Sequence, residues 1–110
     1  MNTRTKSTNI KPETKKIVHE RDRGRCVICG TPVPVAMACA HYIPRSKGGL
    51  GVEQNIFTAC SHCHRLFDQG NGQTRASLKV IVRDYLRKTY YHFDESKLVY
   101  KKWSPDDKAE

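Results

Sequence analysis

Two Cys-x-x-Cys pairs limit what this chain can fold into more than any other feature of its sequence. Cys26 and Cys29 form the first pair, Cys60 and Cys63 form the second, and 30 residues lie between the pairs. Each short turn directs two sulfur atoms to one point, and four thiolates in this spacing suit tetrahedral Zn²⁺. The residues alone also allow two unrelated thiol pairs or a redox dithiol. We favour a structural zinc site, whose four protein ligands leave no position for water.

The length of the chain makes such a link valuable. With 110 residues, the chain can form one small domain whose core is marginal without a staple. The fifth cysteine, Cys39, lies in an apolar stretch, and we expect it to be buried packing rather than a ligand. No segment has the length and apolar character of a signal peptide or a membrane span. We therefore expect a cytoplasmic protein, in which cysteines are more often ligands or free thiols than disulfides.

Basic residues are concentrated at the two ends of the chain. Of a formal net charge of +9, residues 1–25 carry +5, residues 26–73 carry +1 and residues 74–110 carry +3. Basic flanks around a nearly neutral centre favour a polyanionic partner, most often nucleic acid, because released counterions drive the association. Charge alone is equally compatible with a small basic protein that has no such partner.

The local sequence predicts a mixture of helices and short strands. Residues 12–24 favour a short helix, since Pro12 suits its first position and Gly24 suits its end. Two strands are expected within residues 36–43 and 55–59, joined by the turn-forming stretch PRSKGGLG. This order predicts a β-hairpin with a long, glycine-rich loop.

Two further helices follow the second strand. The first is expected over residues 61–69, entered through Ser61 and closed by Gly70. The second and longest spans residues 74–90, where most basic side chains lie off an apolar face made of Leu78, Ile81, Val82, Tyr85, Leu86 and Tyr90. The C-terminal stretch LVYKKWSPDDKAE predicts one edge strand or no regular structure. We divide the chain into a flexible basic tail (1–11), a zinc-braced core (12–73), a C-terminal helix with an extension (74–103) and a flexible tail (104–110).

A histidine and an aspartate share one face of the 61–69 helix. His64 follows Cys63 directly, so the two side chains point about 100° apart, and a Cys63 that faces zinc leaves His64 on another surface. Asp68 lies one turn further along the same face as His64. Such a pair is a half-site for Mg²⁺, Mn²⁺, Ni²⁺ or Zn²⁺. Judged alone, a capping or packing histidine and a surface ion pair are the commoner arrangement.

Between residues 17 and 70 the chain resembles the HNH endonucleases, in particular their small phage and bacterial members. The matching stretches, in order, are ERDRGRCVICG, HYIPRSKGG, NIFTAC and CSHCH. The resemblance implies an α+β fold: a small, treble-clef-like ββα-metal core braced by a structural zinc, with flanking helices. It also implies DNA as the partner and metal-dependent hydrolysis of its phosphodiester bonds, leaving 5′-phosphate and 3′-hydroxyl ends.

The resemblance implies roles for three residues. His41 would be the general base that takes a proton from water, Asn55 would tie the loop between the strands, and His64 would hold a divalent ion. A buried core histidine at 41 and a plain turn asparagine at 55 are the alternatives. Many family members carry a further ligand just before the base, where this chain has Ala40. We expect Asp68 to replace it, and a weaker alternative makes His41 itself a metal ligand.

Basic residues around these positions are expected to bind DNA. Arg45 and Lys47 lie beside His41 in the sequence and would contact phosphates next to the scissile one. The polar side of the 74–90 helix would extend this contact, together with Lys15, Lys16, Arg23 and Arg25. The rival hypothesis is a non-catalytic, zinc-stapled DNA-binding module, which Ala40 favours. A treble-clef domain for protein interaction explains the cysteines and leaves His41 without a purpose. The family suggests phage or restriction partner proteins, and the sequence predicts no oligomeric state.

Overall fold

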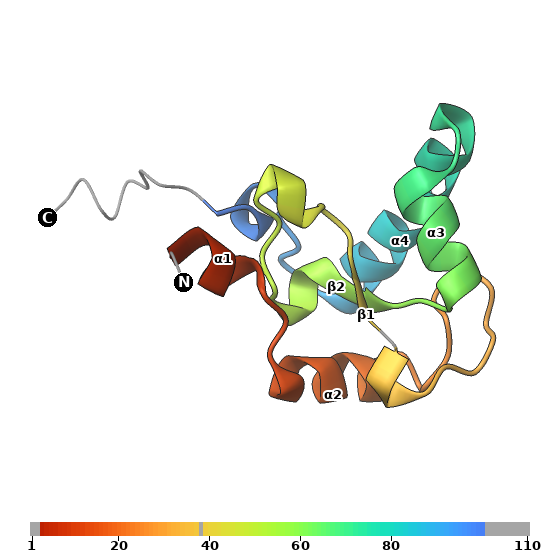
Figure 1. Cartoon of the computed structure of the whole chain (residues 1–110), viewed down its shortest axis with the longest axis horizontal. Coiled ribbons are helices and arrows are strands. Elements are labelled where there is room, and N and C mark those ends of the chain that lie inside the picture. Colours follow the sequence, from red (N-terminus) through yellow and green to blue (C-terminus); the bar gives the residue numbers. More distant parts are fainter. Residues whose placement is uncertain (1–2, 38, 101–110) are drawn as a thin grey trace, which may run out of the picture.

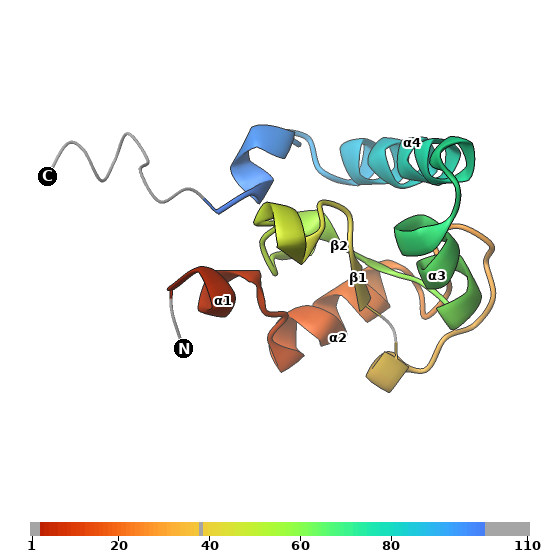
Figure 2. The same ribbon diagram turned by 45° about the horizontal axis from the view of Figure 1, so that its top comes forward.

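Two short strands lie at the centre of the structure and helices surround them (Figure 1). The computed structural model describes residues 3–37 and 39–100. Its helices and strands are α1 (Thr3–Thr8), α2 (Pro12–Arg21), β1 (Cys39–His41), β2 (Ile56–Thr58), α3 (Ser61–Gln69) and α4 (Gly72–Thr89). Single turns of 3₁₀ helix, η1 to η4, cover Val35–Met37, Arg45–Lys47, Glu53–Asn55 and Glu95–Leu98. The view in Figure 2 shows the strands between α2 on one side and α4 on the other.

The strands pair antiparallel and are followed directly by α3. In their register Ala40 lies opposite Phe57, and His41 lies opposite Ile56. Ala40 is buried while Cys39 and His41 are half-buried, because successive side chains of a strand point to opposite faces. A two-stranded sheet is marginal alone and needs helices packed on it. The expected mixed fold, with two antiparallel strands, a following helix and a four-cysteine cluster, is confirmed.

The core is built from β2 and the helices around it. Phe57 and Phe67 meet edge to face with ring centroids 5.1 Å apart, and Val82 and Leu86 of α4 pack in the same cluster. The prediction that Ile81 belongs to the buried apolar face of α4 is wrong, since its side chain is 43% exposed. Ile81 lies about 100° around the helix from Val82, at the edge of the buried stripe.

A buried ion pair connects the end of α2 to β2 and α4. Arg21 contacts Asp22 at 2.7 Å and donates a further hydrogen bond to the Ile56 carbonyl at 2.8 Å. The Asp22 carboxylate accepts hydrogen bonds from the Thr58 N–H and the Tyr85 hydroxyl. The sequence analysis did not anticipate this network. It lets two charged groups remain in the interior because each has hydrogen-bond partners there.

Several boundaries differ from those the sequence predicts. Cys60, not Ser61, is the N-cap of α3, because its sulfur accepts the N–H of Cys63. Helix α2 ends at Arg21, three residues before the expected stop at Gly24, which adopts the left-handed conformation in the following turn. Strand β1 is three residues long, shorter than the stretch expected to contain it.

The two ends of the chain also differ from expectation. Residues 3–8, part of the stretch expected to be a polar tail, form α1. Near the C-terminus, where one edge strand or no regular structure was expected, an isolated bridge joins Gly49 to Val99. Residues 101–103 and the tail expected over 104–110 lie outside the described residues, and the division of the chain into four stretches stays a prediction. None of the helices in the described ranges has the length and apolar character needed to cross a bilayer.

Candidate metal centre and groove

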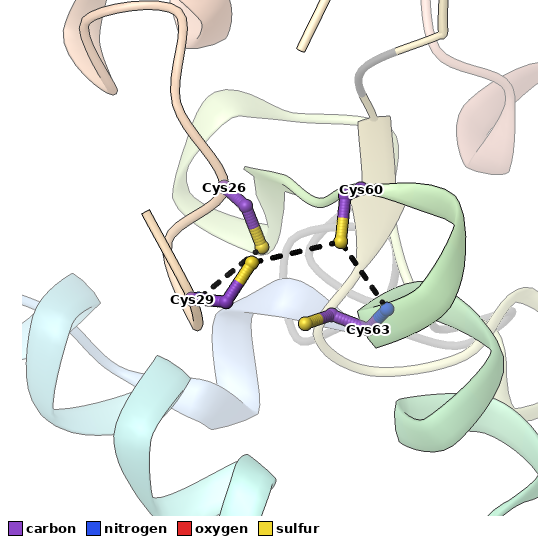
Figure 3. Close-up of side chains that lie close together, drawn as sticks. All are labelled: Cys26, Cys29, Cys60 and Cys63. Atoms are coloured by element: carbon purple, nitrogen blue, oxygen red, sulfur yellow. Dashed lines mark hydrogen bonds between the residues drawn. The ribbon is translucent and has the colours of Figure 1, made fainter. Parts of the chain in front are cut away.

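The four cysteines of the two pairs converge, as Figure 3 shows. Their Sγ atoms all lie within 4.8 Å of one another, although one pair follows α2 and the other begins α3. Within residues 3–37 and 39–100 no other group of three or more His, Cys, Asp or Glu side chains has this closeness. Cys39 is outside the cluster and is half-buried in β1, less buried than the sequence analysis expected.

The cluster has the donor set and the spacing of a structural zinc site. Tetrahedral Zn²⁺ with bonds of about 2.3 Å holds its sulfur ligands about 3.8 Å apart, and the Cys29 and Cys60 sulfurs are 3.7 Å apart. The N–H of Cys29 donates to the Cys26 sulfur and the N–H of Cys63 to the Cys60 sulfur, at 3.5 and 3.4 Å. The four residues therefore fit Zn²⁺.

A groove of about 690 Å³ lies along α3, and several of the remaining candidate residues line it. His41 comes to it from the end of β1, Arg45 and Lys47 from η2, and His64 and Asp68 from α3. Arg75 and Lys79, from the polar side of the 74–90 helix, also line it, as does Ile10, which the sequence did not single out. Residues that are up to 69 positions apart in the sequence thus face one space.

His41 is held by the backbone of the N-terminal segment. Its Nε2 lies 2.8 Å from the carbonyl oxygen of Thr8. A carbonyl only accepts, so Nε2 carries the proton and Nδ1 keeps its lone pair. Burial lowers the pKa of His41, the Thr8 hydrogen bond opposes that effect, and the charge of Arg45 adds to it. The outcome is a largely neutral imidazole, which is the form that a general base requires.

Residues 7–10, here called the N-terminal strap, contact the site at several points. The carbonyl of Ser7 accepts the N–H of Gly51 at 3.0 Å, and the side-chain oxygen of Asn9 accepts from Arg45 at 2.6 Å. With the Thr8 contact to His41, the strap therefore holds the candidate base, a groove arginine and the loop after β1. Two of these three contacts use backbone carbonyls, so no side-chain pattern in the sequence could have indicated them.

Asn55 connects the two ends of the loop between the strands. Its side chain is fully buried. Its amide oxygen accepts the N–H of Ile43 at 2.9 Å, and its NH₂ group donates to the carbonyls of Ile43 and Leu50 at 3.2 and 2.9 Å. These three bonds hold the loop that begins two residues after His41.

His64 and Asp68 face each other on α3. Nε2 of His64 is 3.0 Å from a carboxylate oxygen of Asp68, and the two side chains are 43% and 46% exposed. Both atoms are therefore metal-ligand types that lie close together and open to the groove. Ala40 is buried and offers no ligand atom. His62, on the same helix, is exposed and lies outside the groove.

The six basic candidates divide into two groups. Arg45 and Lys47 line the groove, whereas the other four, Lys15, Lys16, Arg23 and Arg25, do not. Lys15 donates to the carbonyl of Ala36 and Arg25 donates to that of Gly30, both at 3.0 Å. The groove therefore has its own cations, separate from the basic residues of the N-terminal quarter of the chain.

Comparison with known proteins bears on the segment that contains these residues. A family model described as HNH endonuclease matches residues 26–66. The matched segment includes the four clustered cysteines, His41, Asn55 and His64, while Asp68, the N-terminal strap and α4 lie outside it. A search of curated proteins found no match. A search of solved structures found none either.

Proposed function

We propose that this protein, whose residues 26–66 belong to the HNH endonuclease family, is a metal-dependent endonuclease that hydrolyses the phosphodiester bonds of DNA. The observation that carries the proposal is the groove, which brings His41 together with His64, Asp68, Arg45 and Lys47. A base, two adjacent metal-ligand groups and two cations in one open groove are the parts that phosphodiester hydrolysis needs.

His41 takes the proton from the attacking water. Its Nδ1 holds the free lone pair, because Nε2 donates to Thr8. After the transfer both ring nitrogens carry protons, and the Thr8 carbonyl stabilises the imidazolium through the bond that is already in place. Since burial lowers the pKa of His41, the base remains unprotonated at neutral pH.

His64 and Asp68 hold the divalent ion, which is Mg²⁺, Mn²⁺, Ni²⁺ or Zn²⁺. One imidazole nitrogen and one carboxylate oxygen 3.0 Å apart are the atoms that would hold such an ion. When bound, the ion neutralises charge on the phosphate and on the departing 3′ oxygen. Asp68 would take the place of the further ligand that many family members carry at the position of Ala40.

The remaining residues orient the reaction. Asn55 keeps the loop after β1 in place through its three backbone hydrogen bonds, so that His41 keeps its position relative to α3. Arg45 and Lys47 contact phosphates next to the scissile one. Because phosphate contacts position a protein without reading bases, we expect weak sequence preference.

A second candidate function is a zinc-stapled DNA-binding module without cleavage. Ala40 favours it, since a buried methyl group stands where a further metal ligand is expected. Such a protein would bind DNA through the same groove cations and would not cut.

The test is nicking of supercoiled plasmid by the full chain, first without and then with each added divalent ion. We expect nicking only with added metal. His64→Ala should raise the metal concentration for half-maximal nicking at least about tenfold, while His62→Ala, the matched loss of an exposed histidine on α3, should leave it unchanged. Full nicking without added metal, or equal titrations for both variants, would remove the metal role of His64. Salt-sensitive binding without nicking at any metal would favour the module.

A further inference from the structure

We propose that α4 forms a second wall of the substrate groove, on which Arg75 and Lys79 bind phosphates of the DNA strand beside the scissile bond. The proposal rests on the proposed function and deepens it. It assigns substrate contacts to a helix that begins six residues after the segment matched by the family model. The sequence offers the whole polar side of this helix as a candidate, and the groove selects these two side chains from it.

One face of α4 is directed into the groove. Gly72, Arg75, Ala76 and Lys79 line it, and these positions recur at the three- and four-residue spacing of a single helix face. Helices α3 and α4 pack together, so this face lies along the same space as His64 and Asp68. The other cations of α4, such as Arg83, Arg87 and Lys88, do not line the groove.

The charges around the groove fit an anionic ligand. Arg45, Lys47, Arg75 and Lys79 carry four positive charges, and Asp68 is the single acidic residue among the described residues that line it. In the described ranges of the chain neither Arg75 nor Lys79 has an ion-pair partner, whereas Arg83, off the groove, is 3.4 Å from Asp84. The two groove cations of α4 are thus not neutralised by the protein itself.

Lys79 also lies over an aromatic ring that lines the groove. Its Nζ lies 5.6 Å from the centroid of the Tyr42 ring, within range of a cation–π interaction. Tyr42 follows His41 directly, is buried, and donates from its hydroxyl to Glu95 at 2.9 Å. Because the ring is fixed, the ammonium group is partly ordered before DNA binds, and less side-chain freedom is lost on binding.

The spacing of the pair suits the backbone of one strand. Arg75 and Lys79 are four residues apart on the helix, so their Cβ atoms are about 6 Å apart. Two long, flexible cations at this separation can contact neighbouring phosphates without contacting base edges. We therefore assign them the backbone of the DNA rather than any particular sequence.

The experiment compares two charge-matched double variants of the full chain. Arg75→Gln with Lys79→Gln removes the groove pair, and Arg87→Gln with Lys88→Gln removes two cations from the last turn of the same helix. Glutamine keeps a high helix propensity, so both variants should fold, as circular dichroism will verify. Binding to a short DNA duplex is measured without chelator or added divalent ion over a range of salt concentrations, and plasmid nicking is measured separately with metal.

We expect the groove variant to reduce the slope of log affinity against log salt by about two, one for each lost phosphate contact. It should also raise the DNA concentration needed for half-maximal nicking. The control variant should change the slope by less than half as much. Arg75→Lys, which keeps the charge, should retain the wild-type slope.

Equal slopes for the two double variants would overturn the proposal, because the effect would then come from net charge alone. An unchanged slope in the groove variant would overturn it as well. In both cases a wild type that still nicks with metal leaves the proposed function intact. A wild type that neither binds nor nicks would refute the proposed function and, with it, the role of α4.

Discussion

Loss of the zinc site should unfold this protein, and Cys26→Ser is the perturbation that tests it. A zinc ion bound by both Cys29 and Cys60, which are 31 positions apart in the sequence, would close the loop between them. Loop-closure entropy alone makes such a link worth about 4 kcal/mol, and the full binding free energy of a structural zinc is about 10 kcal/mol or more. A domain of this size has a free energy of unfolding of about 5–15 kcal/mol. A variant that no longer holds zinc therefore loses most of its stability.

The assay combines zinc content with thermal unfolding. Wild type should contain one zinc per chain and should unfold when a strong chelator removes it. Cys26→Ser should lose the zinc and show no cooperative transition by circular dichroism. Cys39→Ser is the matched control, because Cys39 is a half-buried cysteine outside the cluster, and it should keep both the zinc and the transition.

Two results would refute this reasoning. One is a wild type that is purified without zinc and whose melting temperature is unaffected by chelator. The other is a Cys26→Ser variant with the same melting temperature as Cys39→Ser, since the four-cysteine cluster would then contribute no more than ordinary packing.

Two further predictions concern contacts that hold the site in place. Arg21→Met leaves the Asp22 carboxylate buried without its cation, so the free energy of unfolding should fall by about 3–5 kcal/mol in urea denaturation. A loss below about 1 kcal/mol would mean that the ion pair contributes little to stability. Gly51→Ala places a Cβ 2.0 Å from the carbonyl oxygen of Asn9 and should displace the N-terminal strap, which lowers the nicking rate while zinc is retained. Ser77→Ala, at an exposed position of α4 that does not line the groove, is its control, and equal rates would remove the strap from the account.

The sequence predicted best where local chemistry decides the structure. The bounds of α3 agree with the expected 61–69 helix, because a capping residue and Gly70 delimit a short amphipathic segment. The cysteine cluster was also predictable, since paired spacing constrains where sulfurs can point. The sequence also predicted the buried stripe of α4. The error at Ile81 arose because a position at the edge of this stripe was assigned to its centre.

The parts that sequence could not predict depend on long-range contacts. The strap contacts His41 and Gly51 through backbone carbonyls, which every residue possesses. In the sequence, Arg21 and Asp22 resemble any charged pair at a helix end, and they are buried only because β2 and α4 pack against them in the fold. Likewise, the sequence separates the cations of α4 from its apolar face and does not show which of them face the groove.

The most direct test of the central claim is metal-dependent plasmid nicking by wild type beside His41→Ala, with DNA binding measured for both without chelator or added divalent ion. The account predicts that wild type nicks, and that His41→Ala keeps its zinc and its DNA affinity while its nicking rate falls by about 10²–10⁴-fold, the contribution of a general base. Nicking by His41→Ala at the wild-type rate would contradict the assignment of the base. Binding by both proteins with cleavage by neither would contradict the nuclease and leave the DNA-binding module in its place.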